Sequence, residues 1–66
     1  MKNKIKVYRA MRNMTQEELA ERLRVTRRTI NSIEGDKYNP SIELAFRIAR
    51  LFEVPVEEMF SLDEEG

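Results

Sequence analysis

The chain has 66 residues, 12 basic and 12 acidic side chains, and neither cysteine nor histidine. These counts exclude disulfides, thiolate chemistry and histidine-based catalysis or metal binding, and the length allows one small domain. No apolar run approaches the ~20 residues that span a bilayer, and the basic start MKNKIK lacks the apolar segment of a secretory signal. We therefore expect a cytoplasmic protein with no membrane contact.

The charges are unevenly distributed along the chain. Residues 1–28 hold nine basic and three acidic residues, a net charge of +6, and residues 29–66 hold three basic and nine acidic residues, a net charge of −6. A chain polarised in this way can present a positive face while staying neutral overall. The alternative is that the charged residues are simply solvated and have no binding role.

The first two expected helices span residues 3–12 and about 16–23. Asn13 is a candidate C-cap for the first helix. Thr15 and Glu18 have the spacing of a capping box at the start of the second helix, where each side chain bonds the backbone N–H of the other. The apolar residues of that second helix share one face: Leu19, Ala20 and Leu23.

A third helix is expected over residues 27–34, with Thr26 as its N-cap. Ile30 and Ile33 point to one side, and Gly35 is expected to end the helix in the left-handed conformation. Two short helices joined by a tight turn form a helix-turn-helix, which cannot bury much surface alone. The rest of the chain must supply its core.

Two further helices are expected in the C-terminal half. The loop 36–40 contains turn residues, after which Ser41 can cap a helix that runs to Phe52, and a short helix follows at about 56–60. The tail 61–66 is acidic and is expected to fray. The residues expected to face the core from the fourth helix are Ile42, Ala45, Ile48 with Ala49, and Phe52. With no strand, repeat or linker expected, the chain is a single all-α domain of five short helices, with its core in residues 4–60.

The outward face of the third helix indicates the function. With Ile30 and Ile33 inward and about 100° per residue, the side chains that point away are polar. They are Arg28, Asn31 and Ser32, with Arg27 on the flank. An α-helix fits the major groove of DNA, where arginine pairs with guanine, asparagine pairs with adenine and serine accepts either base. Two arginines near a helix N-terminus also oppose the helix dipole, a conflict that a phosphate would relieve. An ordinary solvated helix is the alternative.

Residues on either side of the third helix can contact the DNA backbone. Gln16 and the free N–H groups at the start of the second helix can hold a phosphate. The loop residues Lys37, Tyr38 and Asn39 can touch the backbone beyond the third helix. Both features are explained equally well without DNA. Gln16 can simply be a residue favoured in the first turn of a helix, and residues 37–39 can simply form a polar loop.

Several motifs together resemble the Cro/repressor-type helix-turn-helix family of transcriptional regulators. The similarity runs from about Ile5 to Phe60, and spacing and residue type agree over some twenty positions. The motifs that carry it are Thr15-Gln16-Glu17-Glu18-Leu19-Ala20, Val25-Thr26-Arg27-Arg28-Thr29-Ile30, Ile33-Glu34-Gly35, Asn39-Pro40-Ser41 and Ile48-Ala49.

The resemblance implies a compact five-helix domain of the lambda-repressor type that binds operator DNA as a dimer. Arg27, Arg28 and Ser32 match the family's base-reading positions, with Asn31 beside them. Arg9 and Glu34 match a pair that forms a buried salt bridge in some members. The residues expected at DNA phosphates are Gln16, which matches the family's phosphate-clamping glutamine, with Arg24, Thr26, Lys37, Tyr38 and Asn39. Arg24 is a departure, because the family commonly has glycine at this turn position, and a left-handed non-glycine residue there costs roughly 1 kcal/mol.

We therefore expect a sequence-specific DNA-binding regulator, a repressor that binds a palindromic operator as a homodimer. The chain has more apolar side chains than one helix face can bury, and the candidates for the dimer interface are Leu44, Leu51, Met59 and Phe60. An antitoxin-type or purely protein-binding module with the same fold is the alternative. No enzyme activity, cofactor, metal or small-molecule ligand is expected, because the chain lacks the residues and the size for such a site.

Overall fold

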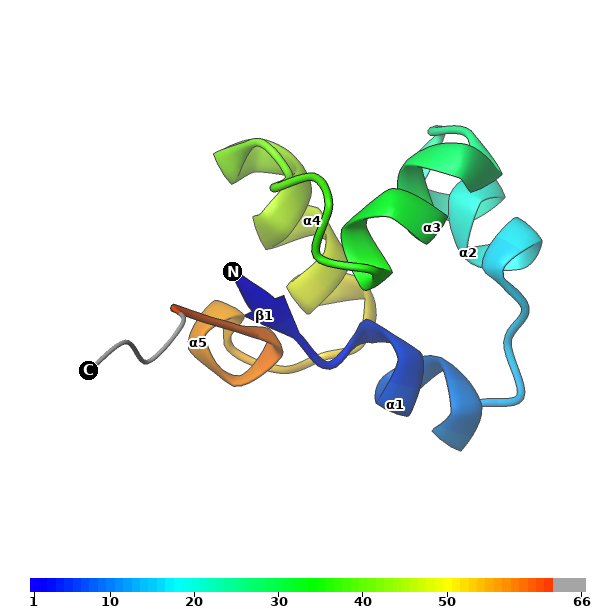
Figure 1. Ribbon diagram of the computed structural model, residues 1–66. Helices are drawn as coiled ribbons and strands as arrows, with labels where there is room; N and C mark the ends of the chain where they lie inside the picture. The colour runs from blue at the N-terminus through cyan, green and yellow to red at the C-terminus, as the bar shows by residue number, and fades with distance from the viewer. Residues whose placement is uncertain (63–66) are drawn as a thin grey trace.

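Five helices and one short strand pair make up residues 1–62, which are the residues that the computed structural model describes. The helices are α1 (Ile5–Met11), α2 (Gln16–Leu23), α3 (Arg27–Glu34), α4 (Ile42–Leu51) and α5 (Val56–Met59). The strands are β1 (Lys2–Asn3) and β2 (Phe60–Ser61). Figure 1 shows α2 and α3 together on one side of the molecule, with α5 and β1 on the other. The expected mostly helical fold is confirmed, and the bounds of α2 and α3 agree with those expected from the sequence.

The strand pair corrects the expectation that the chain has no strand. It is antiparallel, with Lys2 opposite Ser61 and Asn3 opposite Phe60. Two-residue strands have no periodicity that a sequence can display, so they form only because the folded helices bring the two chain ends together. The expected frayed tail is also wrong at its first residue, because Ser61 belongs to β2. Residues 63–66 of that tail lie outside the described residues.

The side chain of Asn3 explains why α1 begins at Ile5 and not at residue 3. Its Oδ1 accepts a hydrogen bond from the Ile5 N–H at 3.1 Å. Its Nδ2 donates to the Ile33 carbonyl at 2.8 Å and to Asp36 Oδ1 at 3.2 Å. Asn3 therefore satisfies a backbone donor at the start of α1 and a carbonyl at the end of α3, which joins these two helix ends.

Side-chain caps start three of the helices, as expected. At α2, Thr15 Oγ1 accepts from the Glu18 N–H at 3.0 Å and Glu18 Oε1 accepts from the Thr15 N–H at 2.9 Å, which completes the capping box. Thr26 Oγ1 accepts from the Thr29 N–H at 3.1 Å at α3, and Ser41 Oγ accepts from a backbone N–H at 3.1 Å at α4. Such caps typically contribute about 1 kcal/mol each.

The ends of four helices use left-handed residues other than glycine. The residues with positive φ are Asn13 (54°), Arg24 (60°), Asp36 (61°) and Glu53 (60°). Arg24 therefore adopts the strained conformation expected for it. Gly35 does not, because its φ is −86° and the left-handed step falls one residue later, at Asp36. Likewise the C-cap of α1 is Arg12, and Asn13 is the left-handed residue after it.

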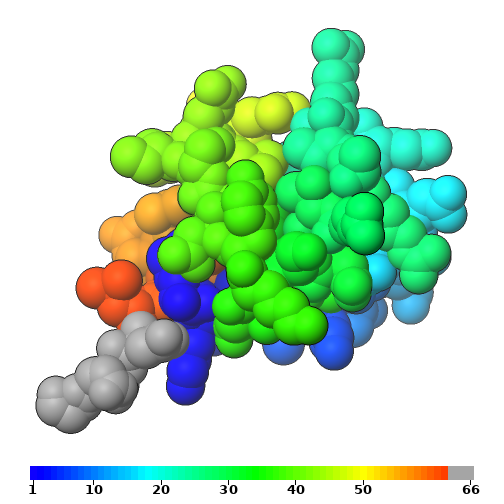
Figure 2. Space-filling view, turned by 45° about the horizontal axis from the view of Figure 1, so that its top comes forward, coloured from blue at the N-terminus to red at the C-terminus, as the bar shows by residue number. Residues whose placement is uncertain are grey.

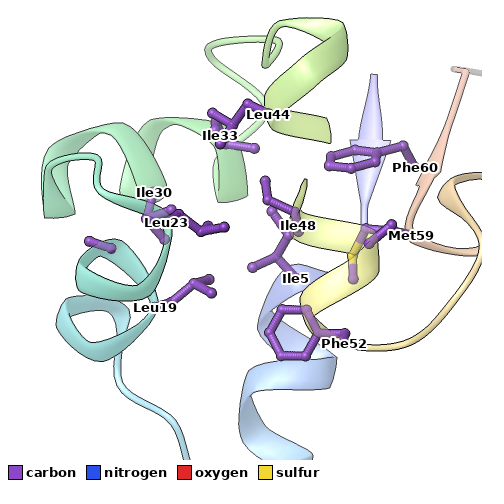
Figure 3. Packing of buried hydrophobic residues seen from close by; sticks show 12 residues of the cluster. Ile5, Leu19, Leu23, Ile30, Ile33, Leu44, Ile48, Phe52, Met59 and Phe60 are labelled. Atoms are coloured by element: carbon purple, nitrogen blue, oxygen red, sulfur yellow. The ribbon is translucent and has the colours of Figure 1, made fainter. Parts of the chain in front are cut away.

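The core is formed by apolar side chains from every helix, and Figure 3 shows how they converge between α1, α2, α3 and α4. Six large side chains are fully buried: Ile5, Leu19, Ile30, Ile33, Ile48 and Met59. The expectation that Ile42 also faces the core is wrong, because its side chain is 77% exposed. Leu44 is buried instead, and two residues along a helix correspond to a rotation of about 200°, so the two side chains cannot share one face.

The residues suggested for a dimer interface are mostly buried within the monomer. Met59 is fully buried, while Leu44 and Phe60 are each 8% exposed. Leu51 is partly buried and packs against the same core. The monomer itself covers these side chains, so little of their apolar surface remains for a second copy.

Candidate nucleic-acid interface

The solvent face of α3 carries three of the four side chains expected to read bases. Ile30 and Ile33 are buried on its inner side, while Arg27, Arg28 and Asn31 are exposed. The fourth residue, Ser32, is only half-exposed. The helix thus presents one long polar face whose donors and acceptors match those of base edges in the major groove.

The first turn of α3 is electrostatically suited to an anion. The first turns of α2, α4 and α5 each contain acidic residues, which offset the positive end of the helix dipole. The first turn of α3 contains none, and it begins with Arg27 and Arg28. Two positive side chains and the unpaired N–H groups of the first turn therefore lie together, an arrangement that a phosphate or a guanine edge would stabilise.

Gln16, the first residue of α2, connects the two helices of the motif. Its Nε2 donates to Glu34 Oε1 at 3.0 Å and to Asn31 Oδ1 at 3.3 Å. Its Oε1 accepts from Arg27 Nε at 3.3 Å. Both amide hydrogens and the amide oxygen are therefore engaged with α3. A phosphate bound at Gln16 would contact its backbone N–H, or would replace the long bond to Asn31.

A nearly buried ion pair supports this amide from beneath. Arg9 Nε lies 2.7 Å from Glu34 Oε2 and Arg9 Nη2 lies 3.1 Å from Oε1, so the pair is bidentate. The side chains are 15% and 4% exposed, respectively. Arg9 also donates to the Met14 carbonyl at 2.9 Å. Glu34 ends α3, where the helix dipole disfavours an acid, and the bonds from Arg9 and Gln16 offset that cost.

The sequence predicted the Arg9–Glu34 pair, which the structure contains, and singled out Gln16, but it did not predict the hydrogen bond from Gln16 to Glu34. The link depends on how α2 crosses α3, since residues 16 and 34 are far apart in the sequence. The sequence signal for this bond would have been an amide at the start of the second helix combined with an acid at the end of the third. In the structure Arg27 and Asn31 of the outer face of α3 are joined through Gln16 to the ion pair in one continuous hydrogen-bonded set.

The residues expected at DNA phosphates lie at both ends of α3. Arg24 is exposed in the turn before it, and Lys37, Tyr38 and Asn39 are exposed in the loop after it. Thr26 differs, because its Oγ1 accepts from the Thr29 N–H and lies 3.0 Å from Thr29 Oγ1. That hydroxyl is committed to capping α3, so a phosphate near Thr26 would be bound by the backbone N–H groups that the cap leaves exposed.

Comparison with known proteins identifies the motif. A family model described as helix-turn-helix matches residues 5–59. An HTH-type transcriptional regulator from Methanocaldococcus jannaschii, MJ0272, is 52% identical over 65 residues, which cover 98% of each chain. The HTH-type transcriptional regulator YgzD of Bacillus subtilis is 45% identical over 66 residues, the full length of both chains. The HTH-type transcriptional activator BcrR of Enterococcus faecalis is 38% identical over 61 residues, 92% of this chain and 30% of that protein.

Proposed function

The chain belongs to the Cro/repressor-type helix-turn-helix family of transcriptional regulators, and from this premise we propose that it represses transcription by binding a palindromic operator as a homodimer. In this proposal α3 enters the major groove, where Arg27, Arg28 and Asn31 read bases and Ser32 borders the groove floor. Double-stranded DNA is the partner, and the cytoplasm is the proposed location.

The observation that carries the proposal is the exposed face of α3, on which Arg27 and Asn31 are both hydrogen-bonded to Gln16 of α2 in the free protein. The bonds between Gln16 and these two residues restrict the long, flexible side chain of Arg27 and orient the amide of Asn31. Restricting them in advance lowers the entropy lost on binding, which favours both affinity and a single mode of recognition. An ordinary solvated helix has no need of such a network.

Contacts to phosphates would complete the interface. The backbone N–H of Gln16, the first turn of α3, Arg24 and the loop residues Lys37, Tyr38 and Asn39 would hold the two DNA strands that border the groove. Such contacts fix the position of the protein on DNA without reading its sequence. They should also make the affinity fall steeply as salt rises.

Selection of bound sequences from a random pool of DNA tests this function. We expect a two-fold symmetric site with half-site centres about 10 base pairs apart, because two α3 helices must enter one face of the duplex. Titration of the selected site at several salt concentrations follows. Absence of any enriched sequence, together with salt-independent binding, would reject DNA recognition.

A reporter gene under the selected operator distinguishes repression from activation. The proposal predicts fewer transcripts when the protein is present and no change when the operator is scrambled. More transcripts would replace repression by activation, which is the activity in the printed name of BcrR.

A protein-binding module with the same fold is the second candidate. Exposed apolar side chains on α1, Val7 and Met11, are the observation that favours it, because neither contributes to the core. An antitoxin would use such a surface for a protein partner and still bind DNA through α3. A module that binds only protein would have no salt-dependent affinity for bulk DNA, so the salt titration separates the two.

A further inference from the structure

The side-chain amide of Asn31 is exposed on α3 and has only one of its two ends engaged. Its Oδ1 accepts a hydrogen bond from Gln16 Nε2 at 3.3 Å. Its Nδ2 has no hydrogen-bond partner within residues 1–62. Figure 2 shows the surface of α3 and of the loop after it, in green, turned toward the viewer. The oxygen of this amide is therefore held toward α2, while its two N–H groups remain for a ligand.

Two neighbours of opposite hydrogen-bonding character fix the orientation of the Gln16 amide. Glu34 Oε1 lies 3.0 Å from Gln16 Nε2, and a carboxylate that is already bound by Arg9 can only accept. Arg27 Nε lies 3.3 Å from Gln16 Oε1, and a guanidinium can only donate. Exchanging the nitrogen and oxygen of the amide would place two acceptors together on one side and two donors together on the other. Gln16 therefore presents Nε2 to Asn31.

The orientation of the Asn31 amide follows from that of Gln16. Only Oδ1 of Asn31 can accept from an N–H, and the reversed amide would place two donors against each other. The carboxylate of Glu34 thus determines, through Gln16, which end of the Asn31 amide is free. Glu34 is 4% exposed and is bound by Arg9, so this determinant lies beneath the surface that a DNA base would contact.

An asparagine with only its nitrogen free does not suit adenine. Bidentate pairing with adenine uses both ends of the amide, because the oxygen accepts from N6 and the nitrogen donates to N7. The bond to Gln16 turns Oδ1 of Asn31 toward α2, which leaves Nδ2 to meet a base edge. Guanine presents two acceptors, N7 and O6, to the major groove, whereas adenine presents one acceptor beside a donor. A donor at this position therefore matches guanine better than adenine.

We propose that Gln16 is a positioning residue that holds Asn31 as a hydrogen-bond donor, so that Asn31 selects guanine over adenine in the operator. This inference rests on the DNA recognition of the proposed function and names the base that one position of the site carries. The phosphate contact proposed for Gln16 is its backbone N–H, so its side chain stays bonded to α3 when DNA is bound.

The first part of the test locates the base and identifies it. Selection of bound sequences with the wild type and with Asn31→Ala shows which base pair Asn31 contacts, as the position at which the preference relaxes. We expect guanine at this position of the wild-type site. Titration of two operators that differ only there should show binding about tenfold tighter with guanine than with adenine, the size of one good base contact.

The second part tests whether Gln16 sets this preference without touching the base. Gln16→Ala releases Oδ1 of Asn31 for adenine, so the ratio of guanine to adenine affinities should fall by about tenfold. Lys37→Ala is the matched control, because Lys37 is exposed in the loop after α3 and is proposed to hold a phosphate. The control should weaken binding equally on both operators and leave the ratio unchanged. Circular dichroism checks that each variant is folded, and Gln16→Met, which keeps the side-chain length, replaces Gln16→Ala if that variant unfolds.

Adenine at the position that Asn31 contacts would overturn the inference while leaving DNA recognition intact. An unchanged ratio in the Gln16 variant, with equal losses on both operators, would also overturn it, because Gln16 would then only hold a phosphate. An Asn31→Ala variant that relaxes no position would mean that Asn31 reads no base. A selection that enriches no sequence with the wild type would instead overturn the proposed function, and the inference with it.

Discussion

The outer face of α3 and the exposed apolar side chains of α4, Ile42 and Phe46, both lie at the protein surface, but they are built in opposite ways. On the outer face of α3 the side chains are polar, and two of them, Arg27 and Asn31, are bonded through Gln16 to the Arg9–Glu34 pair. Ile42 and Phe46 are apolar and project from a helix whose other face is in the core. A polar reading face needs support so that its donors keep one geometry, whereas an apolar surface needs only a complementary shape.

The largest effect should come from breaking the support of the α3 face. Glu34→Ala leaves Arg9 nearly buried without its partner, which can cost about 3–5 kcal/mol of unfolding free energy. In a domain of this size such a loss can approach the whole stability. Urea unfolding measures it. A loss below about 1 kcal/mol would mean that the pair behaves as a surface ion pair and supports nothing.

The second prediction compares two isoleucines of α4. Ile48 is fully buried, so Ile48→Ala should lower the free energy of unfolding by about 2–5 kcal/mol at every protein concentration. Ile42 is exposed in the monomer, so Ile42→Ala should leave the stability of the monomer unchanged. It should reduce only the stabilisation that comes from association of two copies, which rises with protein concentration. Thermal unfolding over a range of concentrations separates the two. Equal, concentration-independent losses would remove the distinction between core and interface.

The structure clarifies which features of the fold a sequence can predict. The starts of α2, α3 and α4 were predictable because a cap is local: Thr15, Thr26 and Ser41 each bond a backbone N–H three residues away. The strand pair was not, because two-residue strands exist only through contacts between the chain ends. The left-handed step after α3 was assigned to Gly35 because glycine tolerates it best, yet Asp36 takes it.

The candidate sites show the same contrast between local features, which the sequence predicts, and contacts between distant segments, which it does not. Helical periodicity was enough to identify Arg27, Arg28 and Asn31 as outward-facing, because Ile30 and Ile33 fix the inner side of α3. The core residues of α4 could not all be chosen from the sequence, since Leu44 and Ile42 are equally apolar and only the packing of α4 decides which one is buried. The bond between Gln16 and Glu34 depends on the same kind of tertiary information.

The third prediction tests whether the α3 face reads bases. Arg28→Ala should cost about 1–3 kcal/mol on the selected operator and relax the preference at one base pair. Arg22→Ala is the control, because Arg22 is an exposed arginine of α2 outside the polar face of α3. Binding titrations on operator and random DNA measure both variants. Equal losses on the two DNAs would mean that Arg28 only holds a phosphate.

The smallest effect concerns the turn between α2 and α3. Arg24 is left-handed, so Arg24→Gly removes strain of roughly 1–2 kcal/mol but adds about 0.5–1 kcal/mol of backbone entropy cost. We expect a net gain in the free energy of unfolding of between zero and about 1.5 kcal/mol, measured by urea unfolding. If Arg24 contacts a phosphate, the same variant should bind DNA more weakly at every sequence and with a shallower salt dependence. Unchanged binding would remove Arg24 from the interface.

The central claim is that two copies of this chain, bound together, present two α3 helices to one face of DNA. Inserting about five base pairs between the half-sites of the selected operator tests it most directly, because half a helical turn moves one half-site to the opposite face. The account predicts that binding falls to the level of random DNA. Affinity that is unchanged by the insertion would contradict it, since each α3 would then bind its half-site independently.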